Sequence, residues 1–391
     1  MGKIEIDHTG SGSGITLSSD GSDLLLDGTA IGGGGGTDLE LYAENPSSPA
    51  ANTVTGTNSA AIGSNLTVSG NASFAVGVGA TATGYASFAF GDGSDATNNY
   101  AIAMGGNSAT ASAPQAIAIG YGVDATGQDS IALGRNSQAR ASSANAFGRD
   151  SYAIGSQATA LGDSYASGTD SFAAAIANNT SSYGATGANS VAIGDRAKAS
   201  NAGATAIGRL NQATSFNSTA IGGYSNQATQ LYSVAIGGYA SSSIINKMAF
   251  GNYSLFSVGA AQAGTFVFVS NTTDATPEAL TANNSTAGTT NQIILPNNSA
   301  YAFHGTIVAR QQASQGTACA AWKVEGLIRR EGSAGTTVLV NSTTTVLDNT
   351  PSWGMALSAD TTNGGLKIEV TGAASTNIRW VATINTSEVT Y

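Results

Sequence analysis

The sequence predicts an all-β protein in which a parallel β-solenoid with coils of about 14 residues is followed by a C-terminal β-sandwich knob of jelly-roll type. Three observations support this fold class. A phrase of alanine, an apolar residue and glycine recurs along the first two thirds of the chain. The segments after residue 264 alternate apolar and polar residues with period two. The composition joins 51 glycines to only 10 % charged residues, which favours a narrow core of small side chains.

The first predicted part, residues 1–52, is strongly acidic. It contains eight acidic residues and one lysine, a balance of 1 − 8 = −7 within a formal net charge of −10. Short alternating segments predict a few strands here, and the five glycines at 32–36 predict a hinge because they bury no side chain. We expect this part to be an attachment segment.

The second predicted part, residues 53–263, is the repeat. Thirteen glycines close the phrase, and of the twelve intervals between them nine are 14 residues, two are 15 and one is 32. A unit of this length suits two short strands joined by turns, which is one coil of a solenoid. The interval of 32 is most simply two coils with about four inserted residues, so a loop is expected at 177–187. The closing glycines are Gly63, Gly77, Gly91, Gly105, Gly120, Gly134, Gly148, Gly162, Gly194, Gly208, Gly222, Gly237 and Gly251.

Alternation along a strand assigns the residues of each phrase to two faces. The residues one and three before the glycine, such as Ile193 and Val191, are mostly large and apolar, and we expect them to stack as a ladder. The residue between them is alanine in all thirteen phrases. Because a solvent-facing position would vary, the constant alanine predicts close packing against a neighbouring protomer. The candidate trimer-interface alanines are Ala192, Ala206, Ala220 and Ala235.

Two stretches of the repeat resemble a known family. "NSVAIGDRAKASNAGATAIG" (189–208) and "STAIGGYSNQATQLYSVAIGG" (218–238) resemble the head repeats of YadA-like trimeric adhesins, and the resemblance extends over about residues 57–260. It implies a left-handed parallel β-roll and a homotrimer with the alanine face near the shared axis. The N-terminal segment and "LPNNSAYAFHGTIVARQ" (295–311) also resemble parts of tail-fibre and other virion proteins of tailed phages, notably those infecting cyanobacteria.

The third predicted part, residues 264–391, is the knob, and it holds all three tryptophans. Trp322 and Trp380 alternate with aliphatic residues and are expected in the core, whereas Trp353 follows a loop sequence and is the first candidate for a glycan contact. Arg329 and Arg330 form either a solvated strand end or a contact to an anionic surface. The knob also contains Arg310 and Arg379, and tryptophan and arginine are frequent in binding hot spots.

The residue inventory argues against several functions. Residues 53–263 contain no glutamate and no histidine, so an enzyme would depend on scattered turn aspartates, and we expect no catalysis and no cofactor. Asp92 and Asp95 could hint at calcium, but they lack the recurring aspartates of calcium-binding β-rolls and suit an ordinary turn. Cys319 is the single cysteine, which excludes an internal disulfide. No basic stripe predicts a nucleic-acid ligand.

The predicted function is that of a structural virion fibre or tail-fibre adhesin. No run of 18 apolar residues and no apolar run of signal-peptide length occurs, so synthesis in the host cytoplasm, no membrane insertion and a final place on the exterior of the particle are expected. Residues 1–52 would bind tail or capsid proteins, and the knob a host cell-surface glycan or protein. The alternatives are a polysaccharide-degrading tailspike and the passenger domain of a bacterial trimeric surface adhesin.

Overall fold

The computed structural model describes residues 51–174, 181–252, 257–349 and 351–391, together with the backbone of five short strands nearer the N-terminus. The predicted hinge at 32–36 lies outside the described residues. Within the described part, strands and one short 3₁₀ turn, η1 (Ala334–Thr336), make up the regular structure, so the predicted all-β class is confirmed. The five N-terminal strands are β1 (Ile4–Ile6), β2 (Ile15–Ser19), β3 (Leu24–Leu26), β4 (Thr29–Ala30) and β5 (Leu39–Leu41).

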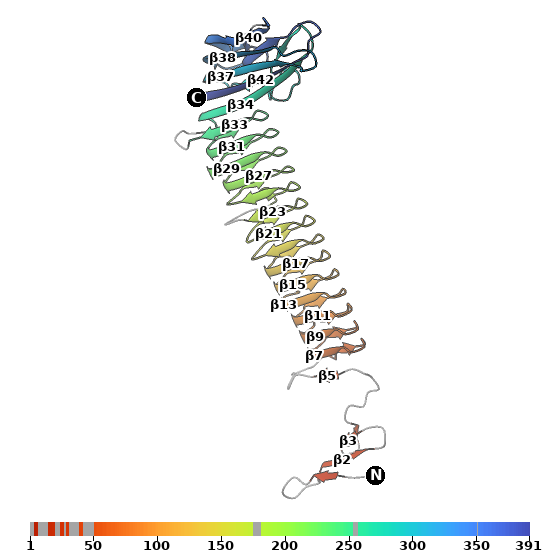
Figure 1. Cartoon of the computed structure of the whole chain (residues 1–391). Coiled ribbons are helices and arrows are strands. Elements are labelled where there is room, and N and C mark those ends of the chain that lie inside the picture. The colour runs from red at the N-terminus through yellow and green to blue at the C-terminus, as the bar shows by residue number, and fades with distance from the viewer. Residues whose placement is uncertain are drawn as a thin grey trace.

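Strands β1 to β4 form an antiparallel sheet in sequence order, whereas β5 pairs in parallel with the first long strand of the solenoid. From β6 (Thr53–Val54) onward the described chain winds into a rod of stacked coils, which we call the shaft (Figure 1). Each coil contributes one long and one two-residue strand, so the shaft has two parallel sheets and the predicted solenoid is confirmed. Fourteen short strands at roughly 4.8 Å spacing give a length on the order of 60 Å.

The long strands are β7 (Ala60–Ser64), β9 (Phe74–Val78), β11 (Phe88–Asp92), β13 (Ile102–Gly106), β15 (Ile117–Tyr121), β17 (Ile131–Arg135), β19 (Asn145–Phe147), β21 (Thr159–Leu161), β23 (Phe172–Ala174), β25 (Val191–Ile193), β27 (Thr205–Arg209), β29 (Thr219–Tyr224), β31 (Val234–Gly238) and β33 (Met248–Gly251). The short strands are β6 (Thr53–Val54), β8 (Thr67–Val68), β10 (Thr81–Ala82), β12 (Asp95–Ala96), β14 (Thr110–Ala111), β16 (Asp124–Ala125), β18 (Gln138–Ala139), β20 (Tyr152–Ala153), β22 (Tyr165–Ala166), β24 (Gly184–Ala185), β26 (Lys198–Ala199), β28 (Gln212–Ala213), β30 (Gln227–Ala228) and β32 (Ser241–Ser242).

The register places each phrase against the same phrase of the next coil. Ala206 pairs with Ala220, for example, and the closing glycines pair with one another where the strands are long enough. The interval of 32 residues does contain two coils, because Ala173 lies between Ala160 and Ala192 in the ladder of pairs. Of the expected loop at 177–187, residues 177–180 lie outside the described residues, and residues 184–185 form strand β24 instead.

The interior of each coil is filled by alanine, and this corrects the predicted interface. Ala192, Ala206, Ala220 and Ala235 are 0 % exposed in the single chain, where they belong to the same buried cluster as alanines of the short strands such as Ala213. These four side chains therefore point into their own coil and cannot contact a neighbouring protomer. The position is constant because only a small side chain fits between two sheets this close together.

Buried serines and asparagines complete the interior on the turn side of the alanines. Ser94 Oγ donates to the carbonyl of Gly105 in the next coil at 3.1 Å, and Asn226 Nδ2 donates to the carbonyl of Gly237 at 2.8 Å. The accepting carbonyls lie near the ends of the long strands β13 and β31, so the buried side chains pair with backbone groups of the next coil. The closing glycines are required as predicted: Gly120 has φ of 138°, and a Cβ there would collide with the carbonyl oxygen of Gly134.

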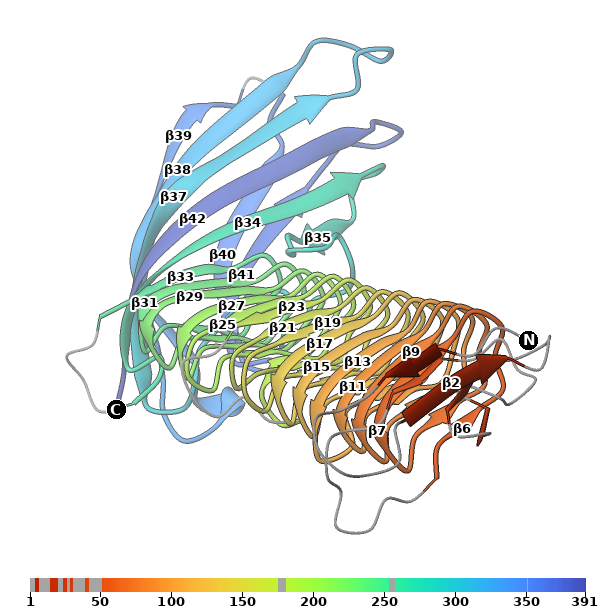
Figure 2. The same ribbon diagram turned by 90° about the horizontal axis from the view of Figure 1, so that it is seen from below.

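The knob is a sandwich of two antiparallel sheets at the C-terminal end of the shaft (Figures 1 and 2). The larger sheet has the order β33-β34-β42-β37-β38-β39, so it is a direct continuation of the long-strand sheet of the shaft. In the smaller sheet β41 pairs on one side with β40 and on the other with β35 and β36. The knob strands are β34 (Ala261–Thr272), β35 (Pro277–Ala279), β36 (Ile293–Ile294), β37 (Ser299–Gln311), β38 (Cys319–Arg330), β39 (Val338–Asp348), β40 (Gly354–Asp360), β41 (Gly365–Thr371) and β42 (Ile378–Thr390).

The knob has a conventional aromatic core between its sheets. The ring of Trp380 stacks on Trp322 at 5.7 Å and lies 5.8 Å from Trp353, and its Nε1 donates to Thr272 Oγ1 at 2.9 Å. Phe266 extends this cluster along β34. Trp322 and Trp380 are thus core residues, as the sequence predicts.

A buried ion pair fastens the last coil to the knob. Lys247 Nζ donates to Glu388 Oε2 at 2.7 Å, and Gln262 Nε2 donates to the same oxygen at 2.6 Å. Burial lowers the pKa of Lys247, an effect that the nearby Glu388 carboxylate opposes. Burial, followed by the charge of Glu388, raises the pKa of Tyr301 well above its usual value. The junction is therefore a buried, polar contact whose parts come from both regions.

Candidate functional site

The first candidate surface is the apolar ladder of the shaft, which faces outward. Because the alanines occupy the interior, the residues on either side of each alanine project from the opposite face of the long-strand sheet. Phe90 is 46 % exposed, Ile119 38 % and Phe250 44 %, and their equivalents in most other coils are half-buried. The predicted ladder exists, but in the single chain it lies on the surface.

This apolar surface passes without interruption onto the larger sheet of the knob. Met248 of β33 is paired with Thr265 of β34, and Phe250 with Ala263, so the outward face of the shaft and that of the knob are the same face of one sheet. Farther along it lie the exposed side chains of Val267 on β34 and Val308 on β37.

Trp353, the predicted glycan contact, is not on a surface. Its side chain is 5 % exposed because it packs against Trp380 in the core. The backbone N–H of Trp353 donates to Asn349 Oδ1 at 2.9 Å, and Asn349 Nδ2 donates to the Trp353 carbonyl at 2.8 Å. The sequence places Trp353 correctly at the end of a loop, but the loop turns its ring inward, so the predicted contact is wrong.

The two adjacent arginines, Arg329 and Arg330, have different surroundings. Arg329 is exposed and forms an ion pair with Glu331, as the solvated strand end requires. Arg330 points to the other side of β38, where its Nη1 donates to the carbonyl of Leu295 at 2.7 Å. Arg330 therefore holds a loop against the strand, and of the predicted contacts in the knob only Arg329 is freely accessible.

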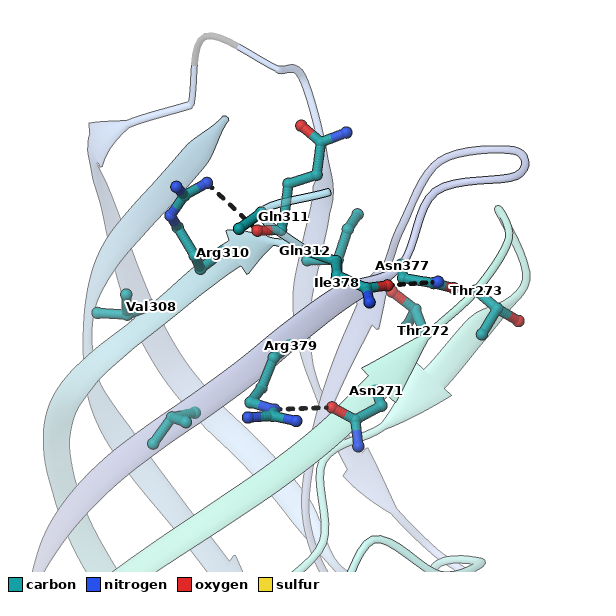
Figure 3. Close-up of a pocket in the computed structure, with 12 residues that line it drawn as sticks. Asn271, Thr272, Thr273, Val308, Arg310, Gln311, Gln312, Asn377, Ile378 and Arg379 are labelled. Carbon is teal, nitrogen blue, oxygen red and sulfur yellow. Dashed lines mark hydrogen bonds between the residues drawn. The ribbon is translucent and has the colours of Figure 1, made fainter. Parts of the chain in front are cut away.

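The second candidate surface is a pocket at the far end of the outward face of the knob (Figure 3). It has a volume of 540 Å³ and is formed by the ends of β34, β37 and β42. Arg310 and Arg379 project into it beside Val308 and Val381. From the sequence both arginines are predicted only as knob residues. Period-two alternation puts each on one face of its strand, but the register that brings the two strands together cannot be predicted from the sequence.

Residues suited to metal binding do not gather in the described ranges. No group of three or more histidine, cysteine, aspartate or glutamate side chains occurs there that could hold a metal ion. Asp92 ends the long strand β11 and Asp95 begins the short strand β12, on the two sides of the turn that the sequence predicts. In the same part of the chain, no helix is long and apolar enough to cross a membrane.

Comparison with known proteins concerns the shaft. The sequence profile of the family described as "YadA head domain repeat (2 copies)" matches residues 69–94, 82–108, 96–122, 125–149, 146–164, 185–210 and 213–240. The shaft is built of YadA-like head repeats. The YadA-like matches cover coils on both sides of the long interval and leave both the N-terminal segment and the knob unmatched. No curated protein sequence matches the chain.

Among solved structures, the chain is similar to the tailspike protein gp49 of Acinetobacter baumannii bacteriophage Fri1, a capsular polysaccharide depolymerase. The two sequences are 10 % identical, the match covers 84 % of this chain and 67 % of that chain, and the TM-score is 0.24. A tailspike protein of the Acinetobacter baumannii phage AM24 is also similar, with 10 % identity, coverage of 90 % and 54 %, and a TM-score of 0.18. At such low scores neither likeness carries an argument about the YadA-like shaft or the knob.

Proposed function

We propose that the protein is a homotrimeric fibre adhesin in which the YadA-like shaft holds the knob away from its anchoring point. The observation that carries the proposal is the outward apolar ladder, which runs the length of the shaft and is too large to remain in water on a monomer. Identical chains cover such a face by closed symmetric association. The number three comes from the family that the repeats resemble, and the contact face is the ladder instead of the alanines.

We further propose that the fibre belongs to a virion. The support is the resemblance of the N-terminal segment and of residues 295–311 to tail-fibre proteins of tailed phages. In this proposal the acidic residues 1–52 bind a tail or capsid protein, and the fibre is made in the host cytoplasm and ends on the exterior of the particle. The knob contacts a host cell-surface glycan or protein without cleaving it, and three knobs on one fibre give weak sites the benefit of avidity.

The oligomer is tested by sedimentation of the full chain at micromolar concentration. We expect a single species with three times the mass of one chain. A species with the mass of one chain would overturn the trimer, and a dimer would overturn the family inference while leaving the ladder as a contact face.

Adhesion is tested by incubating labelled full-length protein with candidate host cells and with their purified surface polysaccharide. We expect saturable binding to cells and an unchanged length distribution of the polysaccharide. Release of shorter saccharides would instead support the polysaccharide-degrading tailspike, and a protein found secreted and anchored on a bacterial surface would support the passenger domain of a surface adhesin.

A further inference from the structure

The pocket at the end of the knob is lined by one arginine from each of two neighbouring strands. Arg310 on β37 and Arg379 on β42 are direct partners in the antiparallel register, and alternation turns both toward the outward face. Like charges directly opposite on neighbouring strands destabilise a sheet. Among the described residues neither guanidinium forms an ion pair, so the fold does not neutralise either charge internally.

Each arginine is oriented by hydrogen bonds that leave other donors for a ligand. Arg310 Nη1 donates to the carbonyls of Gln311, Gly316 and Ala318 at 3.2, 3.3 and 3.2 Å. Arg379 Nε donates to Asn271 Oδ1 at 3.2 Å. The two side chains lie apart, Arg310 toward the turn after β37 and Arg379 toward Asn271 of β34 (Figure 3). A guanidinium has five N–H donors, so each arginine keeps donors that these bonds do not use, and both side chains line the pocket.

The floor next to the arginine pair is apolar. Val308 and Val381 are themselves direct partners two residues along the same strands, and they are 49 % and 37 % exposed. Amide side chains, including those of Gln312 and Asn377, stand at the rim. The pocket therefore contains two guanidinium groups that can bind anions, a flat apolar patch and several neutral hydrogen-bonding groups. Its volume of 540 Å³ is in the range of small-ligand sites.

From this arrangement we propose that the pocket binds an acidic saccharide, with carboxylates of the uronic-acid type held by Arg310 and by Arg379. Arginine binds carboxylates through two parallel N–H···O bonds, which suits a planar carboxylate better than a neutral hydroxyl group. The C–H face of the sugar ring packs on Val308 and Val381, and its hydroxyl groups reach the amides of the rim. This inference rests on the proposed adhesive function and identifies the chemical class of its receptor.

The probe is a defined oligogalacturonide, and its methyl-esterified form is the matched control because esterification removes the charge and keeps the rings. Titration calorimetry of the full-length protein should show binding of the acidic form and at least a tenfold loss of affinity for the ester. Raising the salt concentration should weaken binding of the acidic form only. Equal affinity for the two forms, or no binding of either at millimolar concentration, would overturn the proposal.

Variants test the assignment to the two arginines. Arg310→Gln and Arg379→Gln should each weaken binding of the acidic probe about tenfold or more, and the lysine variants should recover part of it, because lysine keeps the charge without the fork. Lys323→Gln is the matched control, since it removes a positive charge from the same face of the knob outside the pocket and should leave the affinity unchanged. Equal losses in all three glutamine variants would show a diffuse charge effect and contradict the site.

Two further measurements keep this inference separate from the fibre function. If the arginine variants sediment as smaller species than the unmodified protein, the pair serves contact between chains and the ligand assignment is overturned. If both arginine variants adsorb to host cells as well as the unmodified protein, the adhesin stands and the pocket proposal fails. If the full chain binds no host cell yet binds the acidic probe through the arginines, the pocket stands and the proposed fibre function fails.

Discussion

The shaft and the knob bury opposite kinds of side chain, although one sheet passes through both. In the knob, tryptophan and phenylalanine fill the space between two sheets, and valines and polar residues cover the outside. In the shaft, alanine and serine fill the coils, and phenylalanine and isoleucine cover the outside. The knob is therefore a domain with its own hydrophobic core. The large apolar side chains of the shaft lie outside its coils, so that only association with another chain can bury them.

The largest expected loss of stability comes from a substitution that unfolds the knob and leaves the shaft folded. Trp380→Ala removes a fully buried ring that contacts two other tryptophans, and it should cost the knob about 3–5 kcal/mol of unfolding free energy. All three tryptophans lie in the knob, so tryptophan fluorescence follows its unfolding while the far-ultraviolet circular dichroism also follows the shaft. Simultaneous loss of both signals at the lowered temperature would contradict the independence of the two regions.

The junction should come next. Lys247→Met leaves the carboxylate of Glu388 buried without its cation, and breaking such a pair costs about 3 kcal/mol or more. We expect earlier unfolding of the knob and partial relief in the double variant Lys247→Met with Glu388→Gln, in which no uncompensated charge remains. Thermal unfolding of the three proteins measures this, and an additive double variant would show that the two residues are not coupled.

Overpacking tests which face of the shaft is internal. Ala206→Leu inserts three heavy atoms into a closed interior and should destabilise the coils by about 1–3 kcal/mol or more, with a reduced yield of folded protein. Ala202→Leu, placed at a turn and only half-buried, is the control and should fold normally. Normal stability of the Ala206 variant would mean that the alanine face is not the interior.

The outward face should respond in a different measurement. Ile207→Ser with Ile221→Ser removes two ladder side chains from the surface and should leave the coil interior intact. We expect dissociation at low concentration, so that the melting temperature becomes concentration-dependent over a wider range than in the unmodified protein. A sedimentation profile identical to that of the unmodified protein would remove the ladder as a contact face.

The smallest expected effect concerns the turns. Ala72 has φ of 58°, which is a left-handed conformation. At the equivalent position of other coils the same conformation is adopted by Asn58, Asn189 and Asn217. Ala72→Asn should stabilise the shaft by about 0.5–1 kcal/mol because asparagine tolerates this conformation better than alanine. Chemical unfolding measures the gain; a loss of stability would show that backbone strain is not the limiting factor in these turns.

The period of the phrase was sufficient to predict the coils, their register and their two-sheet cross-section, but not which face is inside. Alternation divides the residues of a strand between two faces but does not show which face points into the coil. A constant alanine is compatible both with a narrow interior and with a close contact between chains. The half-period alanines, such as Ala199 and Ala213, are the signal that decides it, because they supply the opposite wall of the coil.

The knob sites were harder to predict for a related reason. The loop position of Trp353 can be read from the sequence, but its burial depends on where Trp380 lies in three dimensions. Arg310 and Arg379 are far apart in the chain, and only the pairing of β37 with β42 makes them neighbours. Local patterns thus describe the shaft, whose contacts repeat from coil to coil, better than the knob, whose contacts are long-range.

The pairing of β33 with β34 has a mechanical consequence. Because the same sheet runs from the shaft into the knob, backbone hydrogen bonds join the two, and the knob has no swivel at this point. A sideways pull on the tip is therefore carried into the stack of coils as a bending load that many hydrogen bonds share. A fixed tip also enters an encounter with its direction already set, so little orientational freedom remains to be lost when it attaches to a surface.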